Sequence, residues 1–125
     1  SYPFDDYLSE KLSQAAEKAD IECETQATYG VTQGPRLETV AEIKRMQRDG
    51  CDIVGMTAMP EAALARELEL KYANLSLVVN WAAGKSDNIH EKPKMISLEE
   101  INQRVTEGNV AMEKIINNVI DLLAD

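Results

Sequence analysis

The chain has 125 residues, of which 44% are hydrophobic, and a formal net charge of −9 at pH 7. This length fits one globular domain with a modest core, and the acidic balance argues against nucleic-acid binding, which depends on clustered Lys and Arg. No hydrophobic run approaches the roughly 18 residues of a membrane-spanning helix, and Cys23 and Cys51 are too few and too distant for a metal site or disulfide framework.

The amino-terminal third predicts one helix and one extended segment. Residues 1–6 have neither the basic nor the apolar region of a signal peptide, and the missing initiator Met indicates a chain that begins within a longer protein. Leu and Ala residues recur at helical spacing over residues 5–20, which predicts a helix. Residues 22–32 carry Thr, Tyr and Val and therefore predict an extended segment.

Three elements are predicted in the middle of the chain. The capping box Thr39-Val-Ala-Glu42 predicts a helix over residues 39–49, with Gly50 as its stop signal. Residues 51–56 form a short apolar run, which is typical of a strand buried on both faces. A second helix is expected over residues 60–70, because Pro is tolerated in a first helical turn and strong helix formers follow it.

The carboxyl-terminal part predicts a strand, a loop and a long helix. Residues 72–80 (YANLSLVVN) give the strongest strand pattern of the chain. The loop is expected over residues 81–95, and Ser97-Leu-Glu-Glu100 is a second capping box that opens a helix to about residue 124. Strands that alternate with helices at this spacing predict an α/β layered fold with a largely parallel sheet.

Polar residues gather where the predicted strands end. Ligands of such folds bind at the carboxyl ends of the strands, and the stretches 33–39, 55–59 and 80–84 fall there. We therefore expect these stretches to line one shared pocket. Each polar residue also has a structural explanation. Thr57 can cap a helix with its hydroxyl, Arg36 can clamp a neighbouring carboxylate or carbonyl, and Glu38 suits the charge preference of a helix start. Asn80 can pair with loop backbone groups, and His90 can be an exposed loop residue.

The blocks "GPRLETVAEIKRMQRDGCDIVGMTAMPEAALARE" and "YANLSLVVNWAAG" resemble the C-terminal half of the trimeric purine nucleoside phosphorylases, and most of all the methylthioadenosine and S-methyl-5′-thioinosine phosphorylases. The resemblance covers roughly residues 1–125 as a single partial domain. It implies a phosphorylase/hydrolase-like three-layer α/β fold with a mixed, largely parallel sheet. The implied reaction belongs to purine salvage: a purine nucleoside and inorganic phosphate give the free base and a sugar 1-phosphate.

The resemblance also implies the setting of this reaction. Phosphate is a co-substrate, and no cofactor or metal is expected. The partners are the nucleoside and phosphate, without nucleic acid or membrane. The complete protein is expected to be a cytoplasmic homotrimer, which requires the N-terminal half, with its glycine-rich phosphate loop, that this chain lacks.

The resemblance assigns roles to individual residues. Thr57 corresponds to the phosphate-binding hydroxyl and Met56 to the methionine that contacts the ribose. Glu38 corresponds to the carboxylate that accepts the purine N1–H in 6-oxopurine enzymes. Asn80, the expected catalytic residue, stands where adenosine-type enzymes carry Asp, and Ala82 stands where they carry a second Asp.

The remaining assignments concern the base and the 5′ end of the sugar. Leu37 occupies a base-recognition position that usually holds Phe, and Trp81 is either a stacking platform or a loop anchor. Where ordinary purine nucleoside phosphorylases use a histidine for the 5′-hydroxyl, this chain has an apolar segment around Leu98, which favours a methylthio group. His90 is an alternative for that place.

The chemistry of Glu38 and Asn80 favours a 6-oxopurine. Such a base presents an acceptor at O6 and a donor at N1, so the Asn80 amide donates to O6 or N7 while Glu38 accepts from N1–H. Adenine reverses both patterns. A hydrogen bond at N7 also stabilises the negative charge of the departing purine. Methylthioinosine is thus the first expected substrate; methylthioadenosine, inosine and guanosine, a hydrolytic nucleosidase of the same fold, and a non-catalytic fragment remain as alternatives.

Overall fold

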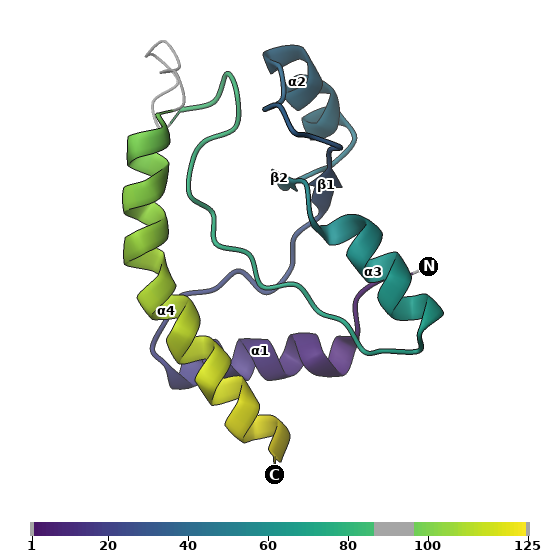
Figure 1. Ribbon diagram of the computed structural model, residues 1–125, viewed down its shortest axis with the longest axis vertical. Coiled ribbons are helices and arrows are strands. Elements are labelled where there is room, and N and C mark those ends of the chain that lie inside the picture. The colour runs from purple at the N-terminus through teal and green to yellow at the C-terminus, as the bar shows by residue number, and fades with distance from the viewer. Residues whose placement is uncertain (1, 87–96, 125) are drawn as a thin grey trace.

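Helices and short strands alternate along the chain, as expected for an α/β fold. The computed structural model describes residues 2–86 and 97–124. In chain order its elements are α1 (Asp6–Lys18), β1 (Tyr29–Val31), α2 (Val40–Arg48), β2 (Ile53–Gly55), α3 (Ala58–Glu67) and α4 (Leu98–Ala124), shown in Figure 1. The predicted helices are all present, with boundaries within two or three residues of those expected.

The two strands pair in parallel, which confirms the predicted strand direction. In the ladder, Tyr29, Gly30 and Val31 lie opposite Ile53, Val54 and Gly55. The backbone N–H of Thr32 donates to the Gly55 carbonyl at 2.9 Å and continues the ladder one step beyond β1. Both strands therefore end at the same edge, and the segments that leave them begin side by side.

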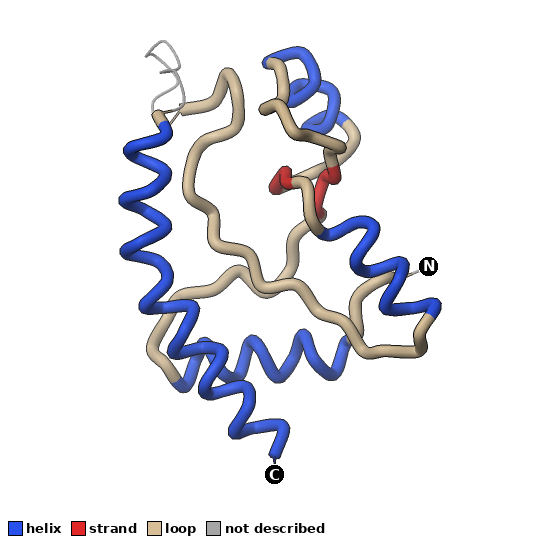
Figure 2. The backbone as a smooth tube through the Cα atoms, in the orientation of Figure 1, coloured by secondary structure: helices blue, strands red, loops and turns tan. Residues whose placement is uncertain are grey.

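The prediction of a strand over residues 72–80 is wrong for this chain. The segment runs as an irregular connection between α3 and the loop before α4 (Figure 2). No backbone hydrogen bond joins residues 73–81 to another described residue. A strand needs a neighbour that completes its ladder, and β-branched residues alone do not supply one.

The other predicted strands are shorter than expected. Of residues 22–32 only Tyr29–Val31 form a strand, and of residues 51–56 only Ile53–Gly55 do. The prediction that the second strand is buried on both faces is also wrong, because all three of its residues remain half-exposed. A strand is buried on both faces only where other elements cover each face of its sheet.

Helix starts follow the predicted capping signals. The Thr39 side chain accepts from the Glu42 N–H and the Glu42 carboxylate accepts from the Thr39 N–H, so the first capping box is confirmed. Ser97 accepts from the Glu100 N–H at 3.3 Å, at the start of α4. In α3, Met59 is extended (φ −124°, ψ 134°), so the regular helix begins at the predicted proline.

The buried core is small and consists largely of small side chains. Among the described residues, eight hydrophobic residues are buried and five of them are alanines. The main cluster lies where α1 crosses α4 and joins Ala15, Ala16 and Ile115, and the Asn118 amide donates to the Ala15 carbonyl at 3.1 Å. None of the described helices is both long and apolar enough to cross a bilayer.

Candidate active site

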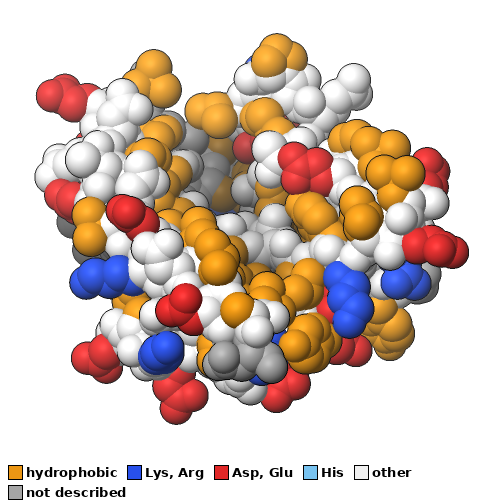
Figure 3. Space-filling model, turned by 60° about the horizontal axis from the view of Figure 1, so that its bottom comes forward, with side chains coloured by type: hydrophobic (Ala, Val, Ile, Leu, Met, Phe, Trp, Pro, Cys, Tyr) orange, Lys and Arg blue, Asp and Glu red, His pale blue; other side chains and the backbone are white. Residues whose placement is uncertain are grey.

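A cavity of about 660 Å³ opens where β1 and β2 end. Its walls come from β2, α2, the turn after β1 and the segment 74–82, and hydrophobic side chains border the hollow on the face shown in Figure 3. The shared pocket expected at the strand ends is therefore present. Seven residues to which the resemblance gives a site role line it: Leu37, Glu38, Met56, Thr57, Asn80, Trp81 and Ala82.

Two glycines allow the segments around the cavity to approach each other. Gly34 has φ +66°, and a Cβ there would lie 2.5 Å from Met56 Sδ. Gly55 sits under the ring of Tyr29, whose hydroxyl would be 2.0 Å from an added Cβ. Any side chain at these positions would therefore displace Met56 or Tyr29, both of which line the cavity.

Thr57 presents an unused hydroxyl at the cavity. It occupies the N-cap position of α3, yet its side chain makes no capping hydrogen bond. The side chain is exposed, and no described residue bonds to its hydroxyl. The capping explanation for Thr57 is therefore wrong, and its O–H is available to a ligand.

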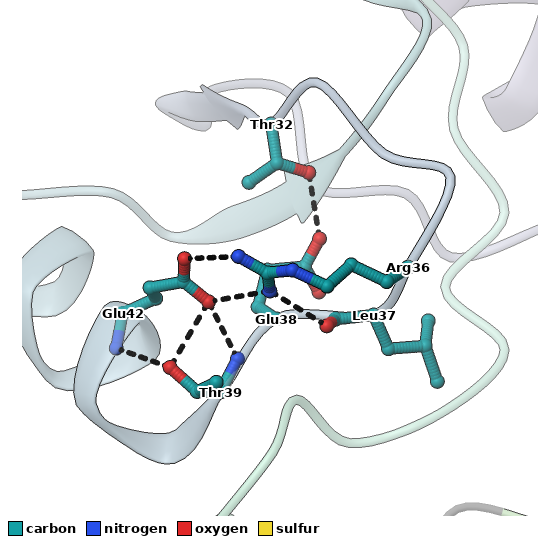
Figure 4. A network of polar contacts seen from close by, with 6 residues as sticks. All are labelled: Thr32, Arg36, Leu37, Glu38, Thr39 and Glu42. Atoms are coloured by element: carbon teal, nitrogen blue, oxygen red, sulfur yellow. Dashed lines mark hydrogen bonds and ion pairs between the residues drawn. The ribbon is translucent and has the colours of Figure 1, made fainter.

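Glu38 is held by a neutral donor. The Thr32 hydroxyl donates to Glu38 Oε1 at 2.6 Å (Figure 4). Within the described chain, nothing donates to Oε2, and the carboxylate forms no ion pair. Glu38 thus faces the cavity as a half-buried carboxylate with one oxygen free to accept a hydrogen bond.

Arg36 pairs with Glu42 rather than with Glu38. Its guanidinium donates to both Glu42 oxygens, at 2.9 and 2.8 Å, and to the Leu37 carbonyl at 3.1 Å (Figure 4). The predicted role of Arg36 as a clamp on a carboxylate and a carbonyl is confirmed. The hydrogen bond from Arg36, followed by those from Thr39, lowers the pKa of Glu42, and the same pair raises the pKa of Arg36.

We expect Glu42→Gln to lower the melting temperature by a few degrees at pH 7, because it removes the ion pair that ties the turn to α2. A lowered carboxyl pKa contributes stability above the ordinary pKa of Glu, and this contribution is lost as the pH falls through the folded-state value. The difference in melting temperature from wild type should therefore shrink below about pH 4. Thermal unfolding followed by circular dichroism measures it.

Glu113→Gln is the matched control, because Glu113 is exposed on α4 and pairs with no described residue. A loss from Glu42→Gln that is the same at pH 7 and pH 3 would show that the charge of Glu42 is not what stabilises the turn.

The segment 80–82 forms the wall opposite the turn. The Asn80 amide donates to the Trp81 carbonyl at 2.8 Å, so the structural explanation for Asn80, a partner of loop backbone groups, is confirmed for this chain. Trp81 is 54% exposed and Leu37 is 50% exposed, so neither ring nor branched side chain is packed away from the opening. The side chain of Val40 lies against Gly84, which brings this segment close to the start of α2.

Leu98 lies apart from the other seven residues. Its side chain is 75% exposed at the start of α4 and does not line the cavity. His90 lies outside the described residues. No group of three His, Cys, Asp or Glu side chains in the described part of the chain is arranged to hold a metal ion.

Two cavity residues and one neighbour of the cavity make contacts that were not expected from the sequence. Among the lining residues, Tyr29 packs on Gly55 and Lys85 donates to Gln47 of α2. Thr32, which does not itself line the cavity, bonds to Glu38. Of these, Thr32 had a recognisable signal: it is a hydroxyl residue that directly follows a strand and stands before the Gly-Pro turn.

Comparison with known proteins places these features in a family. The sequence model described as "Phosphorylase superfamily" matches residues 1–121. The "Probable S-methyl-5'-thioinosine phosphorylase" of Pseudomonas syringae pv. tomato is 55% identical over 108 residues, which are 86% of this chain and 42% of that protein. The "6-oxopurine nucleoside phosphorylase" of Pyrococcus furiosus is 45% identical over 84 residues, 67% of this chain and 32% of that protein.

Solved structures show the same fold. The chain superimposes on the methylthioadenosine phosphorylase from Schistosoma mansoni in complex with adenine with a TM-score of 0.86 at 24% identity, covering 99% of this chain and 47% of that one. The chain spans less than half the length of these proteins.

Proposed function

We propose that this chain, which belongs to the phosphorylase superfamily, forms the base- and ribose-binding part of a 6-oxopurine nucleoside phosphorylase. The observation that carries the proposal is the presence of Glu38 and Asn80 in the walls of one cavity, together with Met56 and the free hydroxyl of Thr57. The carboxylate acceptor and the amide donor suit a purine base, Met56 suits the sugar, and the hydroxyl of Thr57 suits an anion.

The two polar side chains support a base with a donor at N1 and an acceptor at O6. Glu38 offers one free carboxylate oxygen to N1–H. Asn80 has an amide that can exchange its bond to the Trp81 carbonyl for one to purine O6 or N7. As the glycosidic bond breaks, the purine gains negative charge, and a donor at N7 binds that charge more strongly than it binds the neutral ground state.

S-methyl-5′-thioinosine is the proposed nucleoside. The curated relative with 55% identity bears that activity in its name, and a second relative is named for 6-oxopurine nucleosides. The products are hypoxanthine and methylthioribose 1-phosphate. Release of hypoxanthine by the full-length protein should require inorganic phosphate; release at the same rate without phosphate would instead identify a hydrolytic nucleosidase.

Thr57 is proposed to bind the phosphate. In the full-length protein, Thr57→Val should lower kcat/KM for phosphate by roughly 10- to 100-fold, because a hydrogen bond to a charged group contributes roughly 1.5–3 kcal/mol. Initial rates at varied phosphate and saturating nucleoside measure this effect. Thr57→Ser keeps the hydroxyl and should stay close to wild type. If Thr57→Val has wild-type phosphate kinetics, Thr57 is not a phosphate ligand.

The complete protein is proposed to be a cytoplasmic homotrimer without a cofactor, in which residues 1–125 form one partial domain. Large hydrophobic side chains exposed on α3, α4 and the connecting segment support contacts with further protein segments. They include Leu64, Leu68, Leu70, Val78, Ile116, Ile120 and Leu123.

A further inference from the structure

Thr32 is fixed by the sheet at the position from which it reaches Glu38. Its backbone N–H donates to the Gly55 carbonyl at 2.9 Å, and its hydroxyl lies 3.5 Å from the same carbonyl. The residue is half-buried, and its branched Cβ restricts the side-chain rotamer. The hydroxyl therefore approaches Glu38 from a rigid strand end rather than from a mobile loop.

Glu38, by contrast, comes from a turn in which two polar neighbours, Arg36 and Thr39, are already engaged. Arg36, two residues before Glu38, points to Glu42 and to the Leu37 carbonyl. Thr39, directly after Glu38, caps α2. The bond from Thr32 at 2.6 Å is thus the contact that orients the Glu38 carboxylate within the described chain.

The type of donor matters for what Glu38 can do. A guanidinium would engage both carboxylate oxygens through its fork of N–H groups and neutralise their charge. A single hydroxyl holds one oxygen and leaves the other as an acceptor, while the carboxylate as a whole keeps its negative charge. Figure 4 shows this separation: the dashed lines of Arg36 run to Glu42 and to the Leu37 carbonyl, whereas Glu38 is joined only to Thr32.

We propose that Thr32 is a positioning residue that sets base specificity, by holding Glu38 Oε1 so that Oε2 accepts the N1–H of a 6-oxopurine. This inference rests on the proposed function for its ligand. Thr32 contacts neither the base nor the phosphate; it acts through Glu38. Its loss therefore weakens the recognition of N1–H while the phosphate site is unchanged.

The test compares Thr32→Val with Thr32→Ser in the full-length protein. Thr32→Val removes the hydroxyl at nearly constant shape and should lower kcat/KM for methylthioinosine roughly tenfold or more, as expected for a lost hydrogen bond to a charged group. The value for methylthioadenosine should change much less, so the ratio between the two substrates falls. The KM for phosphate should stay unchanged, and Thr32→Ser should restore the ratio.

Thr28→Val is the matched control, because Thr28 directly precedes β1 and its hydroxyl bonds to no described residue. It should behave as wild type. An equal loss on both nucleosides for Thr32→Val, or no rescue by Ser, would mean that Thr32 serves only the stability of the strand end. An unchanged substrate ratio would overturn the inference outright.

Calorimetric binding of free hypoxanthine and adenine separates this inference from the proposed reaction. The wild-type protein could show no phosphorolysis, while Thr32→Val binds hypoxanthine more weakly than wild type and Thr32→Ser binds it equally well. In that case the proposed function fails and the positioning role stands. If wild type and Thr32→Val bind hypoxanthine equally well, or neither binds it, the positioning role is refuted.

Discussion

Asn80→Asp in the full-length protein is expected to lower kcat/KM for methylthioinosine by roughly 100-fold or more. The change replaces an amide donor with a carboxylate that faces the O6 and N7 acceptors of the base. An unsatisfied buried polar group costs roughly 1–3 kcal/mol, and more when it is charged. Activity on methylthioadenosine should rise relative to methylthioinosine, but Glu38 still faces the N1 acceptor of adenine and Ala82 adds no carboxylate, so the gain is limited.

Steady-state kinetics with both nucleosides at saturating phosphate measure this shift. Asn109→Asp introduces the same charge on an exposed position of α4 and should leave both activities unchanged. The pairing of Asn80 and Glu38 with a 6-oxopurine is refuted if the wild-type protein cleaves methylthioadenosine faster than methylthioinosine, or if Asn80→Asp leaves the ratio as it was.

Residues 1–125 alone are expected to show no phosphorolysis. A phosphate dianion in a partly buried site needs several charge-assisted donors. Around the cavity in the described chain, Thr57 has a free hydroxyl, but Arg36 is paired with Glu42 and Lys85 donates to Gln47. The described residues around the cavity therefore offer too few donors to bind and orient phosphate.

The same chain should associate with other protein segments. In the described residues the buried core is mostly alanine, the sheet has two strands, and residues 73–81 make no backbone–backbone hydrogen bond. Size-exclusion chromatography with light scattering, alongside an assay of methylthioinosine and inosine at saturating phosphate, tests both expectations. An active monomer would contradict them and would place the remaining phosphate ligands within these 125 residues.

Local signals in the sequence were sufficient for the helices. Asp5, Thr39 and Ser97 each accept a hydrogen bond from a backbone N–H in the first turn of the helix that follows. Such a signal is local, because the capping residue and the N–H group lie three residues apart. The parallel direction of β1 and β2 also followed from the sequence, because the helix between them is the usual crossover of a parallel pair.

Strand 72–80 could not be predicted correctly because strand formation depends on a partner elsewhere in the protein. Leu75 and Leu77 are half-buried and pack on the helical side, against the α1–α4 cluster and Gly108 respectively. Their hydrophobic pattern alone does not supply the neighbouring strand that a ladder needs. The same limit applies to Thr32 and Glu38, since the conformation of the five intervening residues decides whether the two side chains meet.

The crossing of α1 and α4 has a consequence for how the chain reaches its structure during synthesis. The Asn118 amide and the Ala15 carbonyl are 103 residues apart in sequence, and Ala15 and Ala16 share their buried cluster with Ile115. Closing so long a loop is entropically costly and slow compared with forming local contacts. On the ribosome, α1 therefore emerges before α4 with an uncovered apolar face and can dock only after α4 has been translated.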